Sequence, residues 1–242
     1  MTKVRIKIGI IGYLPFDFNR KMIRKSKVFE IIGEVKEYPI NVQSDLKTWG
    51  YSDKTLEKVV PPRCDEDFFI GITYVPVEND YCVRRLSNNR IVLSYNEMHR
   101  ILKENHIPQE NLLLRALYEY SLVYLRNSNK IPQTKEDDID VHHDTRGCLF
   151  DMYPNLSDIV YSLAPPKLCD ACVTKIRSEE VPETYIKQIQ KELPEINKSR
   201  FYRIWEWVKQ RPIWSIIISA LFGISLSLIA TIIYELLLKG FF

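Results

Sequence analysis

An apolar run near the C-terminal end of the sequence constrains the fold of this chain more than any other feature. From Ile213 to Tyr234 the sequence contains no charged residue, and its polar side chains are almost all serine or threonine. A helix of this length extends about 33 Å, enough to cross the hydrocarbon core of a bilayer, which is roughly 30 Å thick. A soluble helix normally keeps a polar face, which this run lacks. The sequence therefore predicts a single-pass transmembrane helix, expected over residues 213–238.

The charges that flank this run predict its orientation. Positively charged flanks stay on the cytoplasmic side of a membrane, so we expect the N-terminal part of the chain in the cytoplasm. The apolar stretch within residues 1–16 is too short and too interrupted for a signal peptide, and it is more typical of a first β-strand. The basic flank should also attract anionic lipid, which makes membrane lipid an expected partner. One basic residue, Lys239, follows the run, whereas five precede it: Lys198, Arg200, Arg203, Lys209 and Arg211.

The remainder of the sequence has the pattern of an α+β domain. We expect a small mixed sheet with helices over residues 1–177 and a charged, mostly helical connector over residues 178–212. Strand-like segments rich in β-branched residues occupy 3–14, 27–40, 67–77 and 82–95, the last of which is a hairpin that turns at Asn88 and Asn89. Two helices are expected: an amphipathic one over 95–105, and a second over 108–128 that opens with Pro108 and acidic residues in its first turn.

Composition narrows the classes of function. Five cysteines in a reducing compartment favour metal binding or free thiols over a disulfide framework. The net charge of +3 is small, and no basic stripe with interleaved aromatics indicates nucleic-acid binding. The eight glycines form no phosphate-binding loop, so nucleotide hydrolysis is not expected.

Two pairs of ligand-type residues predict a zinc site. Cys169 and Cys172 are separated by two residues, a spacing that lets one turn present two thiolates to a tetrahedral ion. His143 and Cys148 form a second pair upstream, with four residues between them. The sequence therefore predicts one structural zinc ion held by His143, Cys148, Cys169 and Cys172. A site with four protein ligands has no open position for an activated water, so it stabilises the fold and does no chemistry.

The residues around this set have expected roles of their own. His142 adjoins His143, and the alternative in which His142 is the fourth ligand stays open. Asp144 and Asp151 are expected to orient ligands or to cap turns. The other two cysteines, Cys64 and Cys82, have no comparable partners in the sequence and are expected to be ordinary thiols.

The order of these motifs resembles the archaemetzincins, a family of zinc peptidases. In that family a small mixed α/β half precedes a long helix with His-Glu-x2-His-x2-Gly-x2-His, which is followed by a cysteine pair and a distant Cys-x2-Cys. Here His142 stands where the third catalytic histidine would be, His143 takes the place of the adjacent cysteine, and Cys148 follows at the family's spacing. The segment "LCDAC", which contains Cys169 and Cys172, closes the set. The resemblance implies a metzincin-like fold with one structural zinc ion.

The chain departs from the family where catalysis would take place. Tyr118, Glu119 and Leu122 stand at the positions of His-Glu-x2-His, so both catalytic histidines are missing. Glu119 matches the general base, but without a metal-bound water it has no proton to remove. Phe150 stands where the family has a methionine, two residues beyond Cys148. We therefore expect a degenerate metallopeptidase rather than an enzyme.

Three functions remain open from the sequence. The first is a catalytically inactive metzincin-like module that binds an unknown protein partner or ligand at the membrane. The second is a membrane effector in stress or defence that forms homo-oligomers through small residues of the membrane helix, such as Gly223, Ser225 and Ser227. The third is a membrane-bound peptidase with an unorthodox site built from His99, His106 or His142 with Glu97 or Glu119.

Overall fold

The computed structural model describes residues 2–23, 26–47, 49–134 and 141–240. The chain forms two compact units, Met1–Lys198 and Ser199–Phe242, and each is described here by itself. The first unit extends beyond the boundary at residue 177 that the sequence suggested. The charged segment after that residue, expected to be a connector, is folded onto the first unit as far as Lys198.

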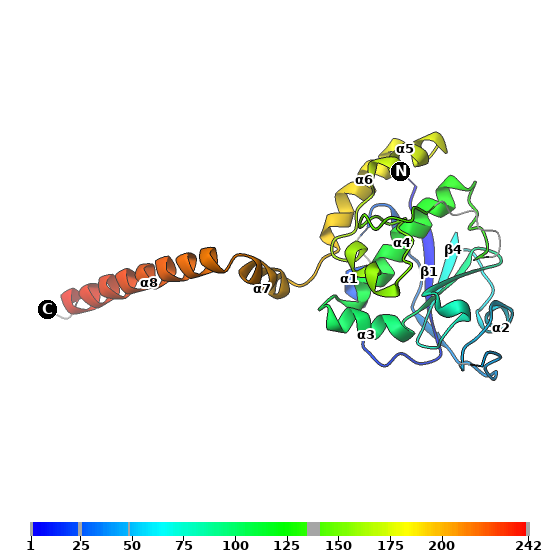
Figure 1. Ribbon diagram of the computed structural model, residues 1–242, viewed down its shortest axis with the longest axis horizontal. Helices are drawn as coiled ribbons and strands as arrows, with labels where there is room; N and C mark the ends of the chain where they lie inside the picture. Colours follow the sequence, from blue (N-terminus) through cyan, green and yellow to red (C-terminus); the bar gives the residue numbers. More distant parts are fainter. Residues whose placement is uncertain (1, 24–25, 48, 135–140, 241–242) are drawn as a thin grey trace. The chain divides into compact units, whose positions relative to one another are not determined.

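A six-stranded sheet forms the centre of the first unit (Figure 1). The order is β2-β1-β4-β6-β5, and β3 pairs with the second half of β1 beyond the end of β2. Every pairing is parallel except that of the β5–β6 hairpin, which confirms the α+β class. The hairpin turns through Asn88 and Asn89 at φ of 57° and 55°, a region that asparagine tolerates. The strands are β1 (Val4–Ile11), β2 (Phe29–Ile31), β3 (Lys36–Tyr38), β4 (Phe68–Thr73), β5 (Val83–Leu86) and β6 (Arg90–Ser94).

The two faces of the sheet pack against different helices. Alternate residues of a strand point to opposite faces, so Phe68 and Ile70 join the large core beneath α4, whereas Phe69 joins a smaller core with Leu56 of α2. Short helical elements complete the connections: α1 (Arg20–Ile23), α2 (Asp53–Val59), η1 (Glu78–Asp80), α3 (Asn96–Glu104) and η3 (Leu156–Ser162).

The helix α4 (Gln109–Arg126) is the central element of the large core. It is buried along 15 of its 18 residues, so it is covered on the side away from the sheet as well. In Figure 1, α4 runs between the strands and the helices α5 (Asp170–Ser178) and α6 (Glu183–Glu192). α6 and the short η4 (Leu193–Glu195) contribute Ile186, Ile189 and Leu193 to the same core. This apolar stripe, at helical spacing in a charged sequence, is the physical reason that the first unit continues to Lys198.

The second unit contains two helices, α7 (Arg200–Gln210) and α8 (Pro212–Gly240). No residue of α7 is buried. Within α8, the segment Pro212–Glu235 is long and apolar enough to cross a membrane, and none of its most apolar window is buried. A helix that is apolar all round is stable only in an apolar environment.

Candidate metal centre

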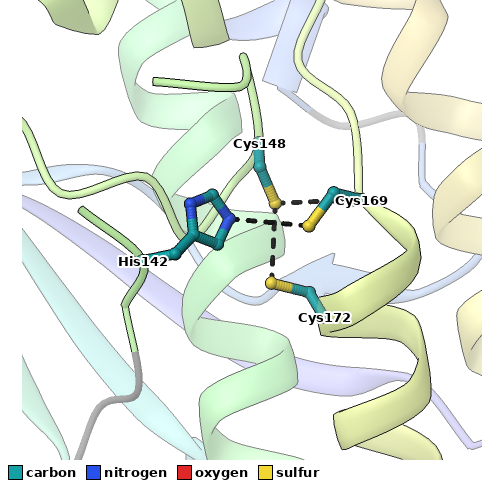
Figure 2. Close-up of side chains that lie close together, drawn as sticks. All are labelled: His142, Cys148, Cys169 and Cys172. Atoms are coloured by element: carbon teal, nitrogen blue, oxygen red, sulfur yellow. Dashed lines mark hydrogen bonds between the residues drawn. The ribbon is translucent and has the colours of Figure 1, made fainter. Parts of the chain in front are cut away.

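Three cysteines and one histidine of the first unit converge on one point (Figure 2). The sulfurs of Cys148, Cys169 and Cys172 and a ring nitrogen of His142 all lie within 4.8 Å of one another. Among the residues that the structure describes, this is the one group of three or more such side chains whose ligand atoms are close enough to share an ion.

The start of α5 positions two of the sulfurs. Cys169 is the N-cap residue of this helix, with extended backbone angles, and Cys172 lies in the first turn. Both side chains can therefore turn toward one point, which is why this pair spacing suits a metal. The partial positive charge at a helix N-terminus also favours the thiolate forms that bind the ion.

A tight turn brings Cys148 beside this helix. Gly147 has a φ of +74°, and a Cβ atom there would lie 2.8 Å from the Tyr161 carbonyl oxygen, so glycine is required. The amide of Leu149 donates to the Lys167 carbonyl at 2.9 Å, and the Lys167 amide donates to the Gly147 carbonyl at 3.0 Å. These bonds hold Cys148 close to the residues that precede α5, where the Cys169 amide donates to its sulfur at 3.4 Å.

The distances between the ligand atoms fit a tetrahedral zinc ion. Zinc–sulfur bonds of about 2.3 Å and zinc–nitrogen bonds of about 2.0–2.1 Å place two sulfurs roughly 3.8 Å apart, and a sulfur and a nitrogen roughly 3.6 Å apart. The sulfurs of Cys148 and Cys172 are separated by 3.8 Å, and Nε2 of His142 lies 3.5 Å from the Cys169 sulfur. The group can therefore hold one zinc ion with all four positions filled by protein.

A buried carboxylate lies beside the histidine. Oδ1 of Asp151 lies 3.2 Å from Nδ1 of His142, and the Asp151 side chain is fully buried. Oδ2 of Asp151 accepts hydrogen bonds from the backbone amides of Arg146, Gly147 and Cys148 at 2.9, 2.6 and 3.0 Å. This carboxylate thus fixes the turn that carries Cys148 and lies beside the His142 ring, whose Nδ1 is hydrogen-bonded to the Asp144 carbonyl oxygen at 3.1 Å. Carboxylates often support metal-bound histidines from such a position.

The electrostatics of the group favour a bound cation. The hydrogen bond between the sulfurs of Cys148 and Cys172 lowers the pKa of Cys148 and raises the pKa of Cys172. Burial opposes the charged form of His142, but its contacts with Cys148 and with the backbone of Asp144 raise its pKa overall. Several thiolates so close together repel one another, and a divalent cation removes that repulsion.

Comparisons with known proteins give one similar fold. No protein-family model matches the chain, and no curated protein matches it in sequence. Among solved structures, the fold is similar to the crystal structure of archaemetzincin from Methanopyrus kandleri, with a TM-score of 0.44 and 14% sequence identity. The similarity covers 73% of this chain and 96% of that chain.

The structure places His142, rather than His143, beside the three cysteines. This corrects the ligand set expected from the sequence and selects the alternative that the sequence left open. The amide of His142 donates to the Phe150 carbonyl at 3.1 Å, and the Met152 amide donates to the His142 carbonyl at 3.0 Å. His143 lies in the bend that follows, is exposed and does not belong to the group. Cys64 and Cys82 lie outside the group, as expected.

The carboxylate that stands where a general base would be is engaged in a buried ion pair. Glu119 of α4 lies 2.6 Å from Nη1 of Arg115, and both side chains are at most one-tenth exposed. Burial raises the pKa of Glu119, and the Arg115 guanidinium pulls it in the opposite direction. Arg115 also donates to the Leu149 carbonyl and to Ser162 Oγ, at 2.6 and 2.9 Å, and its guanidinium lies over the Tyr153 ring.

This network links α4 to the turn that carries Cys148. Only the Arg115–Glu119 spacing is visible in the sequence, because the contacts of Arg115 with Leu149, Ser162 and Tyr153 form through the tertiary fold. Arg115 and Tyr153 are therefore additions to the residues that the sequence singled out.

The residues proposed for an unorthodox peptidase site are dispersed or otherwise engaged. His99 stacks on Phe16, with ring centroids 4.9 Å apart and planes 4° apart. Glu97 is exposed and pairs with Arg100 on the surface of α3. His106 is exposed, at a φ of +55°. None of these residues belongs to the group around the three cysteines.

Proposed function

We propose that this chain is a membrane-anchored module with a metzincin-like domain, stabilised by one zinc ion and without peptidase activity, that binds a protein partner or ligand at the membrane. The observation that carries the proposal is the closed ligand set of His142, Cys148, Cys169 and Cys172. An ion with four protein ligands has no position for a substrate or an activated water.

The surroundings of Glu119 support the absence of peptidase activity. A general base needs an accessible lone pair near the proton that it removes. Here Glu119 is 8% exposed, and its carboxylate is directed to Arg115 within the core. The carboxylate therefore faces an arginine of the same helix and is not presented to solvent as a base.

The helix α8 supports the membrane anchor. Pro212–Glu235 spans about 36 Å as a helix, which exceeds the hydrocarbon thickness of about 30 Å. Its hydroxyls bond to carbonyls of the helix itself: Ser219 to Ser215, Ser225 to Leu221, and Thr231 to Ser227, at 2.8–3.0 Å. These bonds lower the cost of placing hydroxyls in lipid. The basic flank before α8 supports an orientation with the first unit in the cytoplasm.

The metal content of matched histidine variants tests the proposal. Mass spectrometry of the full chain in detergent should find one zinc per chain for the unaltered protein and for His143→Ala, and less than one for His142→Ala. Of these two adjacent histidines, only His142 lies beside the cysteine sulfurs. The comparison therefore distinguishes the loss of a metal ligand from the loss of any histidine in this segment. Two zinc ions per chain would contradict a closed site.

A peptidase assay on the same preparations completes the test. We expect no cleavage of a diverse peptide library by the zinc-loaded chain. Turnover that disappears in Glu119→Gln and persists in Glu97→Gln would overturn the proposal and restore the peptidase alternative.

A second candidate function is that of a membrane effector that forms homo-oligomers through α8. One sequence pattern favours it. Small residues recur at every fourth position of α8, and in membranes such rows let helices approach closely. A Gly223→Leu substitution should weaken self-association in nanodiscs by about 1 kcal/mol, the scale of one helix contact. Ser225→Leu, on the opposite face, is the control, and equal effects of the two would contradict a packed face. The row consists of Ser215, Ser219, Gly223, Ser227 and Thr231.

A further inference from the structure

The helix α7 has an apolar face that its own unit leaves in contact with solvent. At about 100° per residue, Phe201, Ile204, Trp205 and Val208 fall within an arc of about 100°. The first three side chains are 67%, 64% and 48% exposed. A helix of this length with an uncovered apolar face is marginal on its own in water, so its order depends on a surface against which that face packs.

Positive charges stand at both borders of this apolar face. Arg200 and Lys209 lie about 180° apart around the helix, one on each side of the arc. Nζ of Lys209 lies 5.0 Å from the centre of the Trp205 ring, so its methylene chain runs beside the apolar face. Side chains of this kind place their methylenes along an apolar surface and their charge at the level of phosphates. Arg203 and Gln210 lie on the opposite side of the helix.

The helix is also joined to the proposed membrane span by a single residue. Arg211 separates α7 from α8, and its angles, φ −134° and ψ 63°, end the first helix. One residue extends the chain by at most about 3.6 Å, whereas the headgroup layer on each side of a bilayer is about 5–7 Å thick. The C-terminal end of α7 is therefore held at the headgroup level wherever α8 crosses a membrane.

We propose that α7 binds anionic phospholipid as an interfacial helix, with Phe201, Ile204, Trp205 and Val208 immersed below the headgroups and with Arg200 and Lys209 on lipid phosphates. This inference rests on the proposed membrane anchoring by α8. It adds a lipid preference to the anchor, because the cations on both borders favour a negatively charged leaflet.

Hydrogen exchange of the full chain in nanodiscs tests the inference. Discs of phosphatidylcholine alone are compared with discs in which three lipids in ten are phosphatidylglycerol. We expect the amides of α7 to exchange about tenfold more slowly in the anionic discs, and the difference to shrink at high salt. The amides of α8 should be equally protected in both, because a membrane span does not depend on headgroup charge.

Two pairs of variants separate the proposed face from the rest of the helix. Phe201→Asp should abolish the slower exchange, whereas Gln210→Asp adds the same charge on the opposite side and should leave most of it. Lys209→Gln should reduce the lipid dependence more than Arg203→Gln, although each removes one positive charge. Because no residue of α7 is buried, these changes do not disturb a core.

Three other outcomes would be decisive. Fast exchange of α8 in both kinds of disc would overturn the anchor itself. Protected α8 amides with α7 exchange that is equal in the two lipids would leave the anchor and overturn the lipid-binding helix. Protection of α7 that disappears when each disc holds one chain would identify a second copy, rather than lipid, as the surface that covers this face.

Discussion

The helices α4 and α8 both lack an exposed polar face, yet they are covered in different ways. α4 is enclosed by the first unit, with the sheet on one side and α5 and α6 on another. The most apolar window of α8 is entirely uncovered by protein. A helix without a polar face is stable only where something apolar surrounds it, so for α8 we propose lipid as that surrounding.

The polar groups of the two helices also differ in where they find hydrogen-bond partners. α4 carries charged side chains, and these find partners elsewhere in the fold: Glu110 accepts from the Asn19 amide at 2.6 Å, and Arg115 pairs with Glu119. α8 has no charge within the run, and four of its hydroxyls, those of Ser215, Ser219, Ser225 and Thr231, bond to its own backbone. A helix in a protein core can keep charges because neighbouring segments satisfy them, whereas a helix in lipid must satisfy its polar groups itself.

Removal of the metal should have the largest effect, and of the two helices only α4 should be affected. The zinc group holds the turn at Cys148 and the start of α5 against α4, and structural zinc contributes on the order of 10 kcal/mol, comparable to the stability of a whole domain. Chelation or Cys172→Ser should abolish the cooperative thermal transition of the first unit and speed hydrogen exchange in α4. Exchange in membrane-embedded α8 should stay unchanged. Cys64→Ser is the control, and an unaltered transition in Cys172→Ser would contradict a structural ion.

Loss of one partner of the buried ion pair should have the next largest effect. Arg115→Met leaves Glu119 charged and unpaired in the core, which costs about 3–5 kcal/mol. The double variant with Glu119→Leu should regain most of that loss. Urea unfolding of the detergent-solubilised chain measures both, and Arg100→Met, on an exposed pair, should cost less than about 0.5 kcal/mol. A double variant no more stable than Arg115→Met would show that the pair is not the source of the loss.

A charge at the centre of α8 should test whether lipid surrounds this helix. Ile224→Arg places a guanidinium near the middle of Pro212–Glu235, which costs about 2.5–3.5 kcal/mol in membrane insertion. The variant should therefore shift from the membrane pellet to the supernatant after carbonate extraction. Ile213→Arg, at the end of the span next to Arg211, should stay in the pellet. Equal extraction of the two variants would argue against a spanning helix.

The smallest effect is expected where α6 covers α4. Glu192 accepts hydrogen bonds from Ser26, from the Lys27 amide and from the Tyr118 hydroxyl of α4 at 2.6–2.9 Å. Burial raises the pKa of Glu192, but these bonds lower it overall below the usual 4.5. The ionised form thus stabilises the fold above about pH 4.5, and this contribution is lost as the pH falls through the lower folded value.

Glu192→Gln should therefore destabilise the first unit by about 1–2 kcal/mol at pH 7. The gap between variant and unaltered chain should narrow as the pH is lowered below 4.5, measured by urea unfolding at each pH. Glu195→Gln, on an exposed neighbour, should show no such gap. A gap that is constant with pH would indicate lost packing rather than a lost carboxylate.

Much of the fold was predictable from local patterns. The strands β1 and β4, the β5–β6 hairpin and the helices α3 and α4 all lie where β-branched density or helical periodicity indicated them. The sequence predicts a connector around α6 because charged residues dominate its composition, although Ile186, Ile189 and Leu193 form an apolar stripe. Such a stripe becomes decisive only when a complementary surface, here α4, is known to be available.

The candidate site was predictable in its cysteines and not in its histidine. The spacing of Cys169 and Cys172 is a local property, because a helix start alone brings them together. The choice between His142 and His143 depends on the register against Asp151, which is set by backbone pairing and leaves no mark in the sequence. For the same reason, the sequence predicts that Asp151 orients a ligand or caps a turn, but not that it lies beside His142.

The four ligands lie at or near the two ends of the chain segment 142–172. The proposed metal would therefore also act as a cross-link that closes this segment into a loop. Tying the ends of a loop of this length removes disorder from the unfolded chain, an effect worth about 3–4 kcal/mol when a disulfide does it. In a reducing compartment a disulfide between these cysteines would not persist, whereas a zinc clasp would. The topology of this loop would then be controlled by the supply of metal and not by the redox state of the cell.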